Sequence, residues 1–263
     1  MDKQQVHFKD LGIIDYKAAW DYQEKLVNEN VAVKRELREQ SIVNSQWAMG
    51  NGQNTNNDPS PLSNYQLSTL NYQLSTTNHL IFCEHSPVYT LGKSGSMKNV
   101  LLSEAEMDER EIEFFKTNRG GDITFHGLQQ VVGYPILDLE KFYTDIGKYL
   151  RNLEEVIILT LAEFNIEGER SKGETGVWIQ PGVFGKERKI CAMGIRCSRW
   201  ITMHGFALNV NTDLSYFDNI IPCGIQNKQV TSMEKELGYK VNFEEVKRKL
   251  KDNFEKVFDV KII

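Results

Sequence analysis

The cysteine at position 223 has the surroundings of a candidate nucleophile. In the run Ile-Ile-Pro-Cys-Gly-Ile-Gln that ends at Gln226, Pro222 fixes the backbone before Cys223 and Gly224 frees it afterwards. A thiol on such a turn can project from the fold, near amide N–H groups that suit a developing oxyanion. Taken alone, Cys223 also fits the commoner case of an inert thiol. That inert interpretation holds for the cysteines within strand patterns, Cys83, Cys191 and Cys197.

Two further candidate residues lie in strand-like runs. Lys189 begins Lys-Ile-Cys-Ala-Met-Gly-Ile-Arg, and His204 stands in a β-rich run from 200 to 211 whose Gly205 leaves room for a ligand. A lysine at the start of a strand is usually solvated, and a single histidine in a strand is usually structural. Spacing alone therefore leaves both the functional and the structural interpretation open.

The run Arg-Gly-Gly-Asp-Ile-Thr-Phe-His from 119 to 126 favours a small-molecule pocket. Gly120 and Gly121 permit close approach of a ligand, and strand alternation places Asp122, Thr124 and His126 on one face. The alternative is a hairpin in which the glycine pair only turns the chain. The run matches neither phosphate-binding loop pattern.

The remaining pattern predicts an α+β (mixed α/β) fold, with a mixed sheet flanked by helices. Helical spacing predicts a core-facing helix over 145–164, a charge-laced helix over 15–40 and a short one near 103–109. Two capped helices follow, from Thr231 with Glu234 and from Asn242 with Glu245, and Gly238 ends the first of them. Strands are expected at 79–84, 88–91, 111–116, 122–125, 130–137, 176–180, 189–197 and 201–210.

One segment lacks these patterns. Residues 44–78 are rich in Asn, Gln, Ser and Thr, and Asn-Tyr-Gln-Leu-Ser-Thr occurs there twice, at 64–69 and 71–76. We expect a polar low-complexity surface insertion within a single catalytic domain over 1–263, because added loop length costs little free energy. An ordered loop with a role of its own is the alternative.

Composition excludes several classes of protein. The net charge of -5 argues against nucleic acid as a partner. No apolar run is long enough to span a membrane and no secretory signal is present, so we expect a cytoplasmic protein. His79, Cys83 and His85 would share a strand face, but a fourth ligand is not visible, so no metal site is predicted.

Together, these runs resemble the lipoyl(octanoyl) transferase family. The resemblance rests on Arg119 to Gly127, Gly133-Tyr-Pro-Ile-Leu-Asp-Leu139, Lys189 to Arg196, His204 to Asn211 and Pro222-Cys-Gly-Ile, with His85 to Gly92 before them. It runs in order from about 79 to 238. It implies an octanoyl-[acyl-carrier-protein]:protein N-octanoyltransferase of lipoate biosynthesis, on the catalytic-domain fold of biotin and lipoate protein ligases.

The resemblance also assigns roles to residues. The acyl-thioester cysteine falls on Cys223, and the lysine that acts with it falls on Lys189. The implied substrate pocket comprises Arg119, Gly120, Gly121, Asp122, Ile123, Thr124, Phe125, His126, Ala192, Met193, Gly194, Gly205, Phe206 and Ala207. His126-Gly-Leu-Gln-Gln130 departs from the usual His-Gly-Pro-Gly-Gln, which bears on the local backbone and on chain-length preference.

The expected donor is octanoyl-acyl carrier protein, and the expected acceptors are lipoyl-domain proteins such as glycine cleavage H protein and 2-oxoacid dehydrogenase E2 subunits. A thioester is already activated, so no cofactor is expected, and we expect a monomer. The first rival is an ATP-dependent lipoate–protein ligase on the same scaffold, in which Cys223 would be a bystander. The second is a non-catalytic module that binds acyl-carrier or lipoyl domains.

Overall fold

A large mixed sheet forms the centre of the protein. The computed structural model describes residues 3–49, 74–221 and 229–263, and in them the strand order is β12-β1-β2-β6-β10-β9-β8-β7, with β11 beside β9. The strands are β1 (Gln4–Ile13), β2 (Asn78–Glu84), β6 (Gln130–Ile136), β7 (Glu169–Arg170), β8 (Val177–Ile179), β9 (Arg188–Ser198), β10 (Ile201–Asn209), β11 (Gln229–Val230) and β12 (Val260–Ile262). Parallel pairs at β1–β2, β1–β12 and β9–β11 join antiparallel pairs elsewhere, which confirms the predicted mixed sheet.

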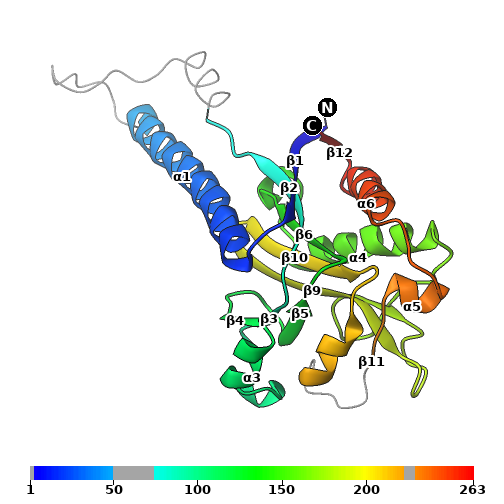
Figure 1. The fold of residues 1–263 in the computed structure, drawn as a ribbon. Coiled ribbons are helices and arrows are strands. Elements are labelled where there is room, and N and C mark those ends of the chain that lie inside the picture. The colour runs from blue at the N-terminus through cyan, green and yellow to red at the C-terminus, as the bar shows by residue number, and fades with distance from the viewer. Residues whose placement is uncertain (1–2, 50–73, 222–228) are drawn as a thin grey trace.

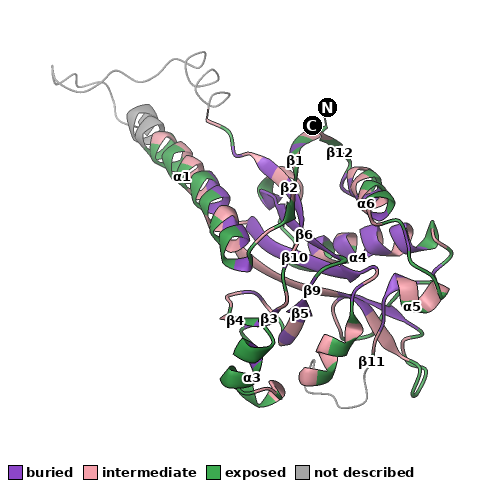
Figure 2. Ribbon diagram, viewed as in Figure 1, coloured by how far each residue is buried: buried purple, intermediate pink, exposed green. Residues whose placement is uncertain are grey.

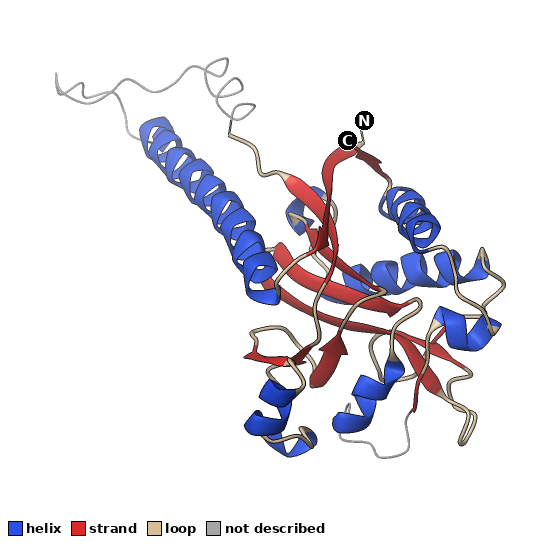
Figure 3. Cartoon of the chain, viewed as in Figure 1, coloured by secondary structure: helices blue, strands red, loops and turns tan. Residues whose placement is uncertain are grey.

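Helices cover both faces of this sheet (Figures 1 and 3). On one side lie α4 (Ile146–Ala162) and α6 (Phe243–Phe258), whose apolar stripes share a core cluster with β6 and β10. On the other side lies α1 (Tyr16–Met49), which packs on a second cluster through Ala19, Leu26 and Val27. Figure 2 shows the buried strands β6 and β10 between the two helical layers. In the described residues no helix is long and apolar enough to cross a membrane.

A smaller sheet packs beside the large one and carries a third core cluster. Its order is β4-β3-β5, with β3 (Val88–Leu91), β4 (Glu113–Lys116) and β5 (Ile123–His126). Around it lie α3 (Glu104–Glu109), η1 (Met97–Asn99) and η3 (Leu214–Asn219), while η2 (Leu139–Lys141) follows β6. Phe125 stacks on Tyr216 with ring centroids 4.5 Å apart, so η3 is fixed to β5.

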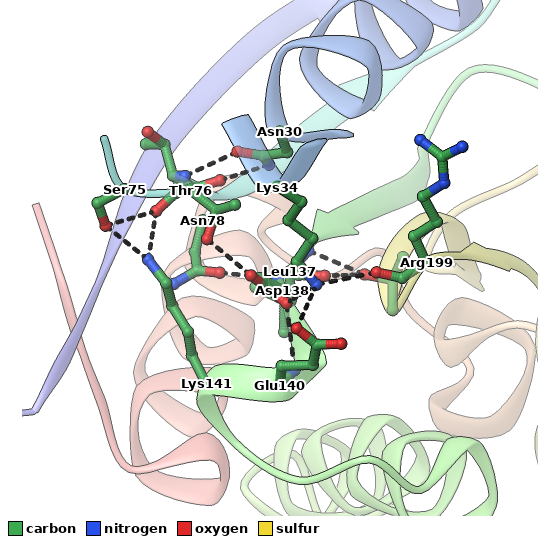
Figure 4. Close-up of polar contacts among 12 residues, drawn as sticks. Asn30, Lys34, Ser75, Thr76, Asn78, Leu137, Asp138, Glu140, Lys141 and Arg199 are labelled. Carbon is green, nitrogen blue, oxygen red and sulfur yellow. Dashed lines mark hydrogen bonds and ion pairs between the residues drawn. The ribbon is translucent and has the colours of Figure 1, made fainter. Parts of the chain in front are cut away.

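A buried polar cluster fixes α1 to the sheet (Figure 4). Lys34 Nζ lies 2.5 Å from Asp138 Oδ1 and donates to the backbone oxygen of Arg199 at the β9–β10 turn. Thr76 donates to the other oxygen of Asp138, at 2.7 Å. Because Asp138 is buried, these partners offset the cost of removing its charge from water.

The sequence missed some elements and misplaced one cap. Strands β1 and β12 were not predicted. The N-cap of α5 (Met233–Leu237) is Ser232, whose hydroxyl accepts from Lys235 N, so the predicted capping box of Thr231 with Glu234 is wrong. The Thr231 hydroxyl instead donates to Glu236. Gly238 ends α5 in the left-handed conformation, as predicted.

The predicted polar insertion only partly overlaps what the structure describes. Helix α1 continues to Met49, so 44–49 are helical, and β2 begins at Asn78. Residues 50–73 lie outside the described residues.

Candidate active site

A pocket of about 400 Å³ lies between the large sheet and β5. The large sheet lines it through β6, β9 and β10, and the loop before β5 closes the opposite side. The structure brings together these residues that the sequence had assigned to the site: Arg119, Gly120, Gly121, Asp122, Ile123, Thr124, His126, Lys189, Ala192, Met193, Gly194, Gly205, Phe206 and Ala207.

Two assigned residues are not among these. Phe125 does not line the pocket, because strand alternation turns its ring into the core cluster of the small sheet. Cys223 lies in the segment 222–228, outside the described residues. The chain is described again at β11, where Val230 pairs with Lys189.

The loop from 119 to 122 is held rigidly against the turn after β3. Backbone N–H groups of Gly92, Lys93 and Ser94 donate to the carbonyl oxygens of Asp122, Arg119 and Gly121. The Arg119 guanidinium is buried and donates to the carbonyl oxygen of Thr90 at 2.5 Å and to its hydroxyl at 2.9 Å. This wall of the pocket is therefore preorganised before a ligand binds.

Glycines let backbones approach closely on the pocket floor. A Cβ at Gly205 would lie 2.1 Å from the Gly133 carbonyl oxygen, and one at Gly194 would lie 2.6 Å from the Gly120 carbonyl oxygen. A side chain at either position would force the neighbouring backbone away. The glycines thus fix the sheet's spacing as well as the width of the slot.

Gly205→Ala is therefore expected to lower the free energy of unfolding by about 1–3 kcal/mol, because the contact is with backbone that cannot yield. Chemical denaturation measures the change. Gly120→Ala is the matched control, since a Cβ there would meet only the Ile195 oxygen, at 3.4 Å. Equal stability of the two variants would contradict this role of Gly205.

Lys189 lies at one end of the pocket, half-buried at the start of β9. Its Nζ is 4.5 Å from the ring centroid of Trp178, its cross-strand neighbour, a distance at which an ammonium is attracted to the indole face. The backbone oxygen of Lys189 accepts from Thr231 N at 2.9 Å. These contacts fix the lysine where the chain returns after Cys223.

Three buried histidines lie at or next to the pocket: His126 and His204 line it, and His85 contacts the lining residues Tyr16 and Tyr134. His126 Nδ1 lies 2.9 Å from Gln130 Oε1, His85 Nε2 lies 2.8 Å from the Tyr134 hydroxyl, and His204 Nε2 lies 2.7 Å from Asn118 Oδ1. Burial lowers the pKa of His85 to about 4 and the pKa values of His126 and His204 to about 3. All three are therefore neutral at physiological pH.

These histidines predict a loss of stability in mild acid. The unfolded chain binds their protons near pH 6.5 and the folded protein does not, so unfolding takes up protons as the pH falls below 6.5. Stability is fully present above pH 6.5, and each histidine is expected to remove about 1 kcal/mol per pH unit below it, down to its folded-state pKa. Denaturation between pH 7 and 5.5 measures this slope. His126→Gln is expected to make it shallower, and an unchanged slope would contradict the assignment.

The other cysteines are poorly suited to act as nucleophiles. Burial raises the pKa of the Cys83, Cys191 and Cys197 thiols above the ordinary value, which disfavours the reactive thiolate. Cys83 Sγ contacts His85 Nε2 at 3.5 Å, but His79 pairs with the ring of His7 instead. Within the described ranges, no group of three metal-binding side chains comes together.

The turn from 126 to 130 forms without the usual Pro-Gly pair. Gln129 adopts the left-handed conformation, with φ 60°, at the position where the resembled family has glycine. Its N–H donates to Glu84 Oε2 at 2.6 Å, and its carbonyl oxygen accepts from Val210 N, Asn211 N and the Thr212 hydroxyl. These bonds offset the strain of a side chain in this conformation.

Sequence reasoning missed part of the lining. Tyr16 on α1 and Gln130, Tyr134 and Asn209 on the large sheet also line the pocket. Tyr134 stands in one of the quoted family motifs, which was a usable signal. The sequence carries no such signal for Tyr16, because the pattern of its helix is typical of a charged, solvated helix.

Solved structures with the same fold include lipoate–protein ligases. The bi-partite lipoate protein ligase of Thermoplasma acidophilum aligns with a TM-score of 0.61 at 14% identity, covering 100% of this chain and 86% of that chain. A lipoate-protein ligase A bound with ATP aligns with a TM-score of 0.59 at 12% identity, covering 100% of this chain and 90% of the other. At these identities the likeness defines the fold, and it confirms the expected catalytic-domain architecture.

Sequence relatives are far more similar. The lipoyl protein ligase A/B catalytic domain model matches residues 62–255. The octanoyltransferase of Flavobacterium psychrophilum is 52% identical over 259 residues, and that of Christiangramia forsetii is 50% identical over 260, each alignment covering 98% of both chains. The chain therefore belongs to the lipoyl protein ligase A/B catalytic domain family and, within it, to the octanoyltransferases.

Proposed function

We propose that this chain transfers an octanoyl group from octanoyl-acyl carrier protein to a lysine of lipoyl-domain proteins, through a thioester on Cys223. Near-complete relatives named octanoyltransferases support the transfer. The observation that carries the proposal is the pocket, which gathers the assigned glycine-rich runs and has Lys189 at one end. No cofactor enters the reaction, because the thioester donor is already activated.

In the first half-reaction, the Cys223 thiolate attacks the donor's thioester carbonyl carbon. A new S–C bond to Cys223 forms, the donor's C–S bond breaks, and the carrier leaves as a thiol after taking a proton. A thiol of ordinary pKa, about 8.5, is only a few per cent ionised at neutral pH. Lys189 acts on this step as a neighbouring cation that favours the thiolate, or as the group that takes the thiol proton.

In the second half-reaction, the acceptor lysine's neutral amine attacks the acyl carbon on Cys223. The N–C bond forms, the S–C bond breaks, and the Cys223 thiolate is regenerated. The amine must lose a proton to give the amide, and we assign that proton to Lys189, which lies on β9 beside Trp178. Since an amide is more stable than a thioester, the transfer proceeds without ATP.

The floor of the pocket suits an unbranched acyl chain. Gly194 and Gly205 let neighbouring backbone close on the floor, while Met193, Phe206 and Ala207 supply apolar surface. Burying the chain contributes about 0.8 kcal/mol per CH₂ before the cost of ordering it. The slot thus binds the acyl chain while Lys189 and Cys223 act on its carbonyl end.

The remaining features of the proposal follow from the sequence. We propose one catalytic domain over 1–263, acting as a cytoplasmic monomer on protein donors and acceptors. Glycine cleavage H protein and 2-oxoacid dehydrogenase E2 subunits are the proposed acceptors.

The ATP requirement of the reaction tests the proposal against its main rival. Purified protein is incubated with octanoyl-acyl carrier protein and an apo lipoyl domain, with and without ATP, and the mass of the lipoyl domain is measured. We expect octanoylation at equal rates in both samples. Octanoylation only from free octanoate with ATP would instead identify a ligase, and no modification under either condition would identify a binding module.

A further inference from the structure

Tyr16 lines the pocket, and its hydroxyl makes no hydrogen bond to another described residue. The residue is only 3% exposed, and it lines the pocket from the first turn of α1. Burial raises its pKa to about 12, so the phenol stays protonated at physiological pH. The hydroxyl is not among the buried polar atoms that lack a partner in the described residues, so it is open to water or a ligand in the pocket.

Three rings fix the position of the Tyr16 side chain. It stacks on His126 with centroids 6.0 Å apart and planes 12° apart, and it contacts Phe115 and His85, each at 5.2 Å between centroids. Asp15 accepts the N–H of Ala18 at 2.8 Å and so fixes the helix start. The Tyr16 ring is therefore a rigid wall of the pocket.

A series of hydrogen bonds links His126, the ring beside Tyr16, to the strand that carries Lys189. The His126 ring that stacks on Tyr16 bonds to Gln130 on β6, and Gln130 Nε2 donates to Asn209 Oδ1 on β10 at 2.8 Å. Asn209 donates to the backbone oxygen of Thr231 at 2.9 Å, and Thr231 N donates to that of Lys189 on β9. These bonds cross from β6 over β10 to β9. The backbones of β6 and β9 are therefore two strand spacings apart, about 10 Å in total. That width is comparable to an extended octanoyl chain.

We propose that the Tyr16 ring is the far end of the acyl slot and sets the chain length that the enzyme accepts. This inference rests on the proposed octanoyl transfer. A chain whose carbonyl is held near Lys189 runs past Ala192 and Ala207, which pair across β9 and β10, and its last methyl group meets the Tyr16 ring. A longer chain would displace water from the Tyr16 hydroxyl and bury that hydroxyl without a partner, which is unfavourable. Tyr16 is thus a specificity-determining residue that does not take part in the bond-making steps.

The test is a series of substitutions at position 16, assayed with octanoyl- and dodecanoyl-acyl carrier protein. The measured quantity is the dodecanoyl-to-octanoyl ratio of kcat/KM. Tyr16→Phe removes only the hydroxyl and is expected to raise the ratio about fivefold. Tyr16→Leu also shortens the wall and is expected to raise it at least about tenfold. Tyr22→Leu, on the same helix but outside the lining of the pocket, is the matched control and should keep the wild-type ratio.

A binding measurement separates this inference from the proposed function. Calorimetric titration with free octanoate and dodecanoate measures the affinity of the slot for each chain, without any transfer step. If the wild type binds octanoate better than dodecanoate and the order shifts in the position-16 variants, the inference stands even where no transfer is found. An unchanged length preference in every folded variant at position 16, in both measurements, would overturn it.

Discussion

Cys223→Ala is expected to lower octanoyl transfer by at least about 1,000-fold, the largest effect among the substitutions considered. Without the thiol there is no group to carry the acyl chain between donor and acceptor, and removal of a nucleophile commonly costs this much or more. The rate of lipoyl-domain octanoylation measures the loss. Thermal denaturation should give a melting temperature close to that of the wild type.

Cys197→Ala is the matched control for that substitution. Cys197 is a half-buried thiol on β9 that does not line the pocket, and burial raises the pKa of its thiol. We expect the Cys197→Ala variant to transfer octanoyl groups at a rate close to that of the wild type. Near-normal transfer by Cys223→Ala would contradict the covalent mechanism.

Lys189→Met is expected to lower transfer by about 10²- to 10⁴-fold, the range for a group that moves a proton in the transition state. Methionine keeps an unbranched side chain beside Trp178 and removes only the charge and the proton site. The variant's rate should rise with pH through about 8.5, because more of the thiol then ionises without help. A pH series of single-turnover rates measures both effects.

Lys186→Met serves as the control for Lys189→Met. Lys186 is exposed, lies three residues before Lys189 and does not line the pocket. The Lys186→Met variant should transfer octanoyl groups at the wild-type rate. Equal rates for the two variants would contradict the role given to Lys189.

Local sequence patterns predicted those helices and strands that have one apolar face. The stripe predicted at 145–164 is α4 over Ile146–Ala162, because Tyr149, Leu153 and Val156 are fully buried against the sheet. The runs at 189–197 and 201–210 are β9 and β10, which form an antiparallel hairpin. In these elements, local spacing and tertiary burial agree.

Elements that depend on distant pairing were not predictable in this way. Strand β1 is mostly exposed along its length and pairs in parallel with β2 and with β12 at the far end of the chain. Its residues show no clean alternation, so only its pairing with distant segments, such as Val6 with Asn78 and Gln4 with Val260, identifies it as a strand. Tyr16 likewise enters the site because α1 packs on the large sheet, which no local spacing reveals.

The sequence motifs predicted which segments form the candidate site. They predicted less well which side chains of those segments face the pocket. The resemblance assigned all of 119–126 to the pocket, whereas alternation along β5 sends Phe125 into the core and leaves Thr124 and His126 facing the pocket. For His204 the sequence is compatible with both a structural and a functional role. His204 has both an Asn118 hydrogen bond and a place in the lining.

The most direct test of the account is detection of the acyl-enzyme. Purified protein is incubated with octanoyl-acyl carrier protein alone, its intact mass is measured, and the adduct is mapped to a peptide. We expect one octanoyl group, labile to hydroxylamine, on the peptide that contains Cys223, and its loss when an apo lipoyl domain is added. An enzyme that octanoylates the lipoyl domain while no adduct forms, or whose adduct maps to another residue, would contradict transfer through Cys223.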